Sequence, residues 1–293
     1  MAFNTKCSPG GIADFLSRER MKLGRKVILY NPGYFSGPSR CQQLLTIHDL
    51  IHITAASGSE AARNRLYYEG VVRPTVRRAG LVLTVSDASA DAIREWLRDE
   101  SVRVVNAGNG CSAQFNAQAV GVRYDRPYFL YVGNFKKHKN PRPALAAMAA
   151  FPDHLLAIVT SDIGAAKRMA AELHVDHQVR IVSNVDDVNL ASLYAGCEAL
   201  VFPSVLEGFG LPVLEALRCG ARIVFYSGAV SVRDICEGTQ FDVDDPSSVD
   251  GFADAMRRAL AEPYTRPPTI DRYDWDLVGA RVDLALKELL RDE

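Results

Sequence analysis

The stretch Val201-Phe-Pro-Ser-Val-Leu-Glu-Gly-Phe-Gly-Leu-Pro-Val-Leu-Glu-Ala-Leu217 is the most informative part of this chain. It continues an apolar run, residues 199–202, which is typical of a buried parallel strand. Pro212 suits the first turn of a helix, where the backbone needs no N–H donor. We therefore expect Glu207 in a loop and Glu215 about one turn into the helix. N–H groups of such a loop can hold a phosphate or a sugar hydroxyl. The alternative is an ordinary strand–turn–helix with two surface glutamates.

Apolar runs alternate with helical patterns around this stretch and predict an α/β fold. The predicted strands of the C-terminal half are residues 128–132, 155–159, 179–182, 199–202 and 222–225, with helices at 143–150, 165–173 and 190–195. The N-terminal half repeats the pattern less clearly, with strands at 43–47, 81–85 and 102–105 and a helix at 89–97. Such βαβ alternation is typical of a parallel sheet that binds its ligands at the carboxyl ends of the strands. Gly133 and Glu207 both fall at such ends.

Length and composition favour two globular domains. A chain of 293 residues is close to two domains of about 150 residues each. The stretch 113–125 lacks periodicity and is the candidate linker, so we place an N-terminal domain at 1–123 and a C-terminal domain at 124–268. A last helix is expected from residue 275 to 290, after Arg266-Pro-Pro268. Six scattered cysteines without a C-x-x-C pair argue against a zinc site or a disulfide framework and favour a reducing compartment.

Charge is distributed unevenly between the halves. Residues 1–123 hold 16 Lys and Arg against 10 Asp and Glu, a net charge of +6, whereas residues 124–293 hold 18 against 25, a net charge of −7. A basic front half could attract an anionic acceptor or a membrane surface. No apolar run reaches 18 residues and no signal peptide is evident, so we expect a cytoplasmic protein with peripheral contact at the inner face of the membrane. No nucleic-acid partner is expected.

The segment Glu-Gly-Phe-Gly-Leu-Pro-Val-Leu-Glu-Ala, residues 207–216, closely resembles the E-x7-E signature of family-four retaining glycosyltransferases. That resemblance implies a GT-B fold, in which two Rossmann-like domains face a central cleft, here with a shortened N-terminal acceptor-side domain. It implies that residues 269–293 cross back to the N-terminal domain. It also implies that Glu207 contacts the donor sugar and that Glu215 holds the ribose. The loop residues that support the sugar would be Gly208, Phe209, Gly210 and Leu211.

Further segments resemble other landmarks of the same family. Residues 131–140 resemble its donor diphosphate loop, which implies donor contacts for Gly133, Asn134 and Lys139. Many members carry Arg at the position of Asn134, so phosphate neutralisation falls mainly on Lys139, with Lys136 as a second candidate. Lysine is a point charge suited to phosphate. The alternative is that residues 136–139 form a solvated run of charges, an interpretation that applies equally to Lys136 and Lys137.

Three weaker matches complete the resemblance. Asn184 and Val185 fall where members pair the nucleotide base through backbone atoms, and Gly11 falls in the family's glycine loop. His48 lies in Thr-Ile-His-Asp-Leu, which resembles the acceptor-side histidine segment, and with Asp49 beside it the ring could orient a hydroxyl. The alternative for His48 is a structural histidine.

These residues lead to one functional expectation and two alternatives. The expected activity is retaining, metal-independent transfer of a hexose from a nucleotide sugar to a glycan or a lipid-linked saccharide, without a cofactor. The segments around His48 and Gly133 most resemble bacterial polysaccharide and O-antigen mannosyltransferases, so GDP-mannose is the first donor to test, followed by a UDP-sugar. A non-catalytic nucleotide-sugar-binding subunit of a glycosyltransferase complex is the main alternative, because the front half is short. A nucleotide-sugar epimerase is disfavoured by residues 207–216.

Overall fold

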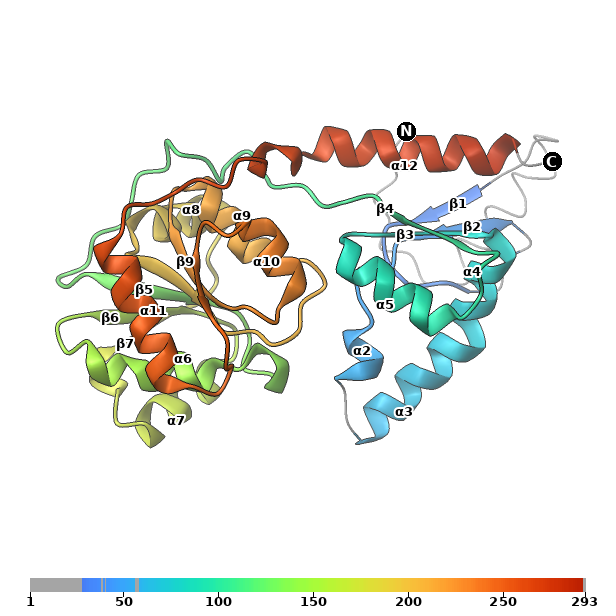
Figure 1. The fold of residues 1–293 in the computed structure, drawn as a ribbon. Coiled ribbons are helices and arrows are strands. Elements are labelled where there is room, and N and C mark those ends of the chain that lie inside the picture. Colours follow the sequence, from blue (N-terminus) through green and yellow to red (C-terminus); the bar gives the residue numbers. More distant parts are fainter. Residues whose placement is uncertain (1–27, 38, 40, 56–57, 292–293) are drawn as a thin grey trace. The chain divides into compact units, whose positions relative to one another are not determined.

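The computed structural model describes residues 28–291, except residues 38, 40, 56 and 57 (Figure 1). Internal contacts divide the chain into two compact units. Unit 1 comprises the described residues up to Asn109 together with those from Asp276 onward, and unit 2 comprises Gly110–Trp275. Gly11 lies outside the described residues.

The segment that follows Asn109 packs within unit 2, whereas the sequence places the boundary after residue 123. The Phe115 side chain is buried, and its ring meets that of Tyr194 edge-on at a centroid distance of 5.9 Å. The Val122 N–H donates a hydrogen bond of 2.9 Å to the Ser192 carbonyl. The stretch without periodicity is therefore held on unit 2 by an aromatic contact and by backbone hydrogen bonds, and neither of these leaves a periodic pattern.

Unit 2 is a six-stranded parallel sheet with the strand order β10-β9-β8-β5-β6-β7. Its strands are β5 (Tyr128–Val132), β6 (Leu155–Val159), β7 (Val179–Val182), β8 (Ala199–Phe202), β9 (Arg222–Tyr226) and β10 (Phe241–Val243). All four residues of β8 are buried, as expected for a parallel strand covered on both faces. The predicted bounds of the first four strands agree with β5 to β8.

Helices cover both faces of this sheet (Figure 1). One face carries α6 (Pro141–Ala147), α7 (Ile163–Glu172) and α11 (Val249–Ala261), whose apolar side chains form one cluster with the strands. The other face carries α8 (Asp187–Gly196), α9 (Leu211–Arg218) and α10 (Val230–Cys236). The loops of this unit also contain short 3-10 turns, which are η2 (Lys137–Lys139), η3 (Met148–Ala150), η4 (Asp176–Gln178) and η5 (Ile270–Arg272). After β10 the chain turns, and α11 begins at Val249.

Unit 1 holds four short parallel strands in two pairs. The pairs are β1 (Ile28–Asn31) with β2 (Gln42–Leu45), and β3 (Leu81–Thr84) with β4 (Arg103–Asn106); a parallel bridge between Thr46 and Leu83 links them. The helical elements are α2 (Ile51–Thr54), α3 (Gly58–Tyr67), the π-helical turn η1 (Tyr68–Val72), α4 (Arg73–Ala79), α5 (Asp87–Leu97) and α12 (Trp275–Arg291).

The last helix, α12, packs on the strands of unit 1. Ala285 and Leu289 are buried in one cluster with Leu44 and Leu83. The Arg281 guanidinium donates a hydrogen bond of 3.1 Å to the Ala107 carbonyl. Apolar contacts and a charge-assisted hydrogen bond together bind the end of the chain to its N-terminal unit.

Candidate functional site

The carboxyl edge of the unit 2 sheet brings two loops together. β5 and β8 are neighbours, paired at Leu130 and Leu200, so the loops that follow them leave the same edge side by side. The Val205 N–H of one loop donates a hydrogen bond of 2.9 Å to the His138 carbonyl of the other. This junction is the type of place at which open α/β sheets bind ligands.

The loop after β5 is fixed by its backbone. The Gly133 N–H donates to the Val159 carbonyl at 3.0 Å, and the chain then forms the turn η2. Asn140 ends that turn with a positive φ of 47°, a conformation that asparagine tolerates better than most residues. Its side-chain amide donates to the Pro203 carbonyl at 3.3 Å and to the Pro246 carbonyl at 2.6 Å. The loop is thereby joined to the segments after β8 and β10.

The loop after β8 ends at Gly210, which has a φ of 110° and caps α9. An added Cβ at this position would lie 3.0 Å from Val232 Cγ2, so both conformation and space favour glycine. The Ser231 hydroxyl donates to the Glu207 carbonyl at 3.1 Å and holds the loop from α10. Among the described residues, none accepts a hydrogen bond from the backbone N–H of Gly210 or Leu211. These N–H groups at a helix start are suited to oxygen atoms of a ligand.

Lys139 and Glu207 form an ion pair where the two loops meet. Lys139 Nζ lies 2.6 Å from Glu207 Oε1, and the two side chains are only 19% and 10% exposed. The ammonium also lies 5.7 Å from the centre of the Phe202 ring. The sequence assigns these residues separately, one to phosphate and one to sugar, whereas the structure places their charges in direct contact.

Tyr131 and Asp162 also belong to this site, although the sequence does not single them out. The Tyr131 hydroxyl donates to the Asn134 carbonyl at 2.8 Å, and Asp162 Oδ2 accepts from the Phe135 N–H at 2.9 Å. Burial raises the pKa of Tyr131 above its ordinary value, and the negative charge of Glu207 adds to that rise. Tyr131 therefore stays neutral beside the ion pair. Its position at the end of a buried strand resembles that of any core tyrosine, which leaves no signal in the sequence.

Glu215 lies on α9, as the sequence predicts, with one carboxylate oxygen held by a neighbouring helix. Its Oε2 accepts a hydrogen bond of 2.9 Å from the Tyr194 hydroxyl of α8. Burial raises the pKa of Glu215 above 4.5, the Tyr194 hydrogen bond opposes that rise, and the charge of Asp187 adds to it. No described contact joins Glu215 to the Lys139–Glu207 pair, although both carboxylates border the same loop–helix segment.

Asn184, Val185 and His48 are the predicted site residues that belong to other segments of the chain. Asn184, with a φ of 55°, and Val185 follow β7 at the edge of the sheet, and no described contact joins them to Lys139 or Glu207. His48 is exposed in unit 1, with its Nε2 2.9 Å from the Pro32 carbonyl. The neighbouring Asp49 accepts the Ile51 N–H through its Oδ1 at 2.8 Å. The roles of these residues stay predictions.

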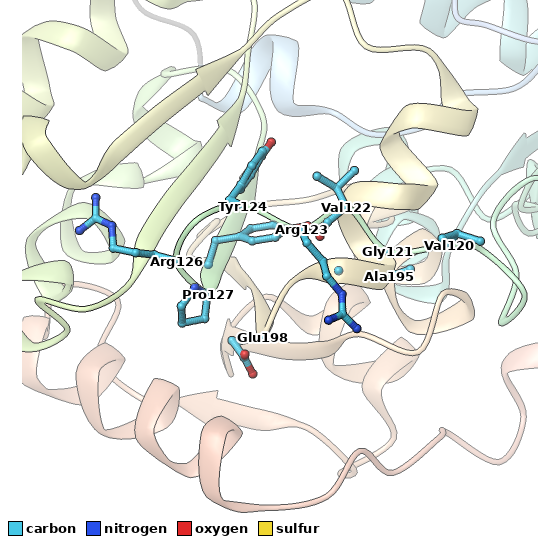
Figure 2. Close-up of a pocket in the computed structure, with 11 residues that line it drawn as sticks. Val120, Gly121, Val122, Arg123, Tyr124, Arg126, Pro127, Ala195 and Glu198 are labelled. Carbon is cyan, nitrogen blue, oxygen red and sulfur yellow. Dashed lines mark hydrogen bonds between the residues drawn. The ribbon is translucent and has the colours of Figure 1, made fainter.

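A cavity of about 510 Å³ opens at the opposite, amino edge of the same sheet (Figure 2). It is lined by Val120, Gly121, Val122, Arg123, Tyr124, Arg126, Pro127, Tyr128, Ala195, Gly196 and Glu198. The charged side chains that line this cavity are those of Arg123, Arg126 and Glu198. Of these, Arg126 already donates hydrogen bonds to the Pro152 and His177 carbonyls. We assign the functional site to the carboxyl edge, because the ion pair and the helix start lie there and parallel sheets bind ligands at that edge.

Comparison with known proteins identifies the family of this chain. The family model described as "Glycosyl transferases group 1" matches residues 112–273, which is more than half of the chain. The chain belongs to this family. The matched region contains both loops of the carboxyl edge and all four of the residues Lys139, Glu207, Tyr194 and Glu215.

Two curated relatives and one solved structure extend the comparison. The O-antigen chain mannosyltransferase B of Escherichia coli is 29% identical over 255 residues, covering 81% of this chain and 66% of the relative. The O-antigen chain mannosyltransferase RfbU of Salmonella typhimurium is 25% identical over 211 residues, covering 71% and 58%. The chain thus spans somewhat less than two thirds of these relatives' own length. The sucrose-phosphate synthase of Thermosynechococcus elongatus superposes with a TM-score of 0.76 at 20% identity, over 97% of this chain and 79% of that one. This likeness supports the GT-B fold.

Residues 28–291, with the gaps given above, contain neither a membrane-spanning helix nor a cluster of side chains suited to a metal ion. No described helix is long and apolar enough to cross a bilayer. Among the same residues, no group of three or more His, Cys, Asp and Glu side chains is arranged to hold a metal ion.

Proposed function

We propose that this protein is a retaining, metal-independent hexosyltransferase. In this proposal it moves mannose from GDP-mannose to a glycan or a lipid-linked saccharide. The observation that carries the proposal is the Lys139–Glu207 ion pair, 2.6 Å apart where the loops after β5 and β8 meet, in a chain of the glycosyl transferases group 1 family. Mannose is the first candidate because two relatives bear the name mannosyltransferase. A UDP-sugar is the second donor to test.

The ion pair suggests how a donor would be bound and activated. Without a donor, Lys139 and Glu207 neutralise each other in a site that solvent reaches poorly. The diphosphate of a nucleotide sugar would compete with Glu207 for the Lys139 ammonium, because lysine can reorient its charge toward phosphate. The carboxylate released in this way would accept hydrogen bonds from hydroxyl groups of the sugar. As the bond to the leaving diphosphate breaks, the ammonium would stabilise the growing negative charge.

The proposal is tested by turnover with the full chain. Purified protein is incubated with GDP-mannose, UDP-glucose or UDP-galactose and with a lipid-linked saccharide fraction, and nucleoside diphosphate release and glycan products are measured. We expect release that depends on the acceptor and survives EDTA, with a product that keeps the anomeric configuration of the donor when analysed by NMR. An inverted product would refute retention, and loss of activity in EDTA with rescue by Mg²⁺ would refute metal independence.

The same experiment distinguishes the proposed enzyme from a non-catalytic subunit, which is the main alternative. Binding of a nucleotide sugar without release or transfer under any of these conditions would favour a non-catalytic subunit of a glycosyltransferase complex.

The proposed location is cytoplasmic, with peripheral contact at the inner membrane face through the basic N-terminal half. Sedimentation with anionic vesicles, compared with neutral vesicles, tests that contact, and equal sedimentation with both would contradict it.

A further inference from the structure

Tyr194 of α8 is a completely buried tyrosine whose hydroxyl reaches a carboxylate of the candidate site. Its side chain is 0% exposed, and its hydroxyl donates to Glu215 Oε2 at 2.9 Å. The Phe115 ring packs edge-on against the Tyr194 ring, with the two centroids 5.9 Å apart, and this contact restrains the tyrosine. The hydrogen bond therefore links a packed aromatic side chain to the carboxylate of Glu215.

The direction of this hydrogen bond follows from chemistry. A buried hydroxyl needs a partner, and an ionised carboxylate is an acceptor only, so the tyrosine is the donor. Burial, together with the charge of Glu215, raises the pKa of Tyr194 well above its ordinary value, which keeps the hydroxyl neutral. The bond occupies Oε2 of Glu215, and no described residue donates a hydrogen bond to its Oε1. One oxygen is thus anchored and the other is available.

We propose that Tyr194 is a positioning residue that holds Glu215 for the ribose diol of the donor nucleotide, and so sets a preference for ribonucleotides over 2′,3′-dideoxynucleotides. This inference rests on the proposed function, because it takes the ligand of Glu215 to be a nucleoside diphosphate. A glutamate has three rotatable side-chain bonds, so a carboxylate anchored at one oxygen loses less conformational freedom when a ligand binds the other. Tyr194 would act through Glu215 and need not touch the ligand.

The test compares two ligands that differ only in the diol. Dissociation constants of GDP and 2′,3′-dideoxy-GDP are measured by calorimetry for the full chain and for Tyr194→Phe, with UDP and its dideoxy analogue used likewise if the protein prefers uridine. We expect the wild type to bind the ribonucleotide more tightly. In Tyr194→Phe the affinity for the ribonucleotide should fall roughly 5- to 20-fold. This loss is smaller than the roughly 10- to 150-fold of a lost direct bond between a ligand and a charged group, because Tyr194 acts on the ligand only through Glu215. The affinity for the dideoxynucleotide should not change.

Tyr128 provides a matched control. It is also a buried tyrosine, and its hydroxyl donates to the Leu193 carbonyl at 2.8 Å, on the same helix as Tyr194 but without a carboxylate partner. Tyr128→Phe should lower stability while leaving the ratio of the two dissociation constants as in the wild type. In a Glu215→Ala background, Tyr194→Phe should alter the ratio no further, because the group that it positions is gone.

Each outcome decides the inference. An equal loss of affinity for both ligands in Tyr194→Phe would show a purely structural role and overturn it, as would a ratio that stays at the wild-type value. A wild type that binds neither GDP nor UDP would refute the proposed function and this inference with it. A wild type that binds ribonucleotide and dideoxynucleotide equally would refute the assignment of Glu215 to the ribose while leaving transferase activity to be judged by turnover.

Discussion

Replacing Lys139 by methionine should separate phosphate binding from all other contacts of the nucleotide. Methionine keeps much of the aliphatic length beside the Phe202 ring and removes only the charge that lies 2.6 Å from Glu207. A charge-assisted hydrogen bond contributes about 1.5–3 kcal/mol, so the dissociation constant for GDP or UDP should rise roughly 10- to 150-fold. The dissociation constant for the nucleoside should stay nearly unchanged, because it has no phosphate for Lys139 to contact. Calorimetry with both ligands gives the two values.

The same substitution should also lower the stability of unit 2. Breaking a fully buried ion pair costs about 3–5 kcal/mol, because an uncompensated charge is left behind. Glu207 is 10% exposed and Lys139 is 19% exposed, so water offsets part of that cost, and we expect a loss of about 1–3 kcal/mol in denaturant unfolding. The double variant Lys139→Met/Glu207→Gln should regain part of the stability without regaining diphosphate affinity.

A lysine of the same turn serves as the control. Lys137 is exposed and lies two positions before Lys139 in η2. Lys137→Met should leave both dissociation constants and the stability close to wild type. A direct role of Lys139 in diphosphate binding would be refuted if Lys139→Met weakened binding of nucleoside and of nucleoside diphosphate equally. It would also be refuted if Lys137→Met weakened diphosphate binding as much as Lys139→Met does.

Three further predictions concern the same loops. Glu207→Gln should lower kcat on the order of 100-fold or more without weakening nucleoside diphosphate binding, because Lys139 loses its competing anion; steady-state kinetics and calorimetry check this, and near-wild-type kcat would exclude the role. Gly210→Ala should reduce stability by about 1–3 kcal/mol in denaturant unfolding. In a Val232→Ala background the same change should cost less, because the steric part is removed while the φ of 110° stays unfavourable. Because burial raises the pKa of Glu215, nucleotide affinity should decline as the pH falls through a value above 4.5, and Glu215→Gln should flatten that profile. The free energy of unfolding should change in the opposite direction. Because the pKa of Glu215 is higher in the folded than in the unfolded state, the folded state binds more protons between these two values. The stability that Glu215 contributes is therefore greatest below pH 4.5 and is lost as the pH rises through the folded-state pKa.

Local signals in the sequence were sufficient for much of unit 2. The run Ala199–Phe202 is buried on both faces and forms β8 as predicted, and Pro212 lies in the first turn of α9. Glu207 and Glu215 accordingly occupy the predicted loop and helix. The helix α11 begins at Val249 because Ser248 caps it by accepting the Gly251 N–H at 2.9 Å, and apolar residues recur along it with helical spacing. β10 has only three residues, too few for a clear pattern.

The contacts that build the site could not be predicted in the same way. Lys139 and Glu207 are 68 positions apart, and they meet because β8 lies beside β5, a strand order that periodicity does not encode. Tyr194 likewise has the sequence context of a core aromatic residue, and its role appears only once α8 and α9 are packed together. The family resemblance supplied roles for single residues, whereas the pairings depend on tertiary structure.

Hydrogen–deuterium exchange with bound nucleotide tests the central claim, that the carboxyl edge of unit 2 is the donor site. Exchange of backbone amides is compared in the full chain with and without GDP, and with UDP as the second ligand. We expect slower exchange in residues 133–140 and 204–215, where the two loops and the start of α9 meet. Protection confined to residues 120–128 and 195–198, which line the cavity at the amino edge, would contradict it.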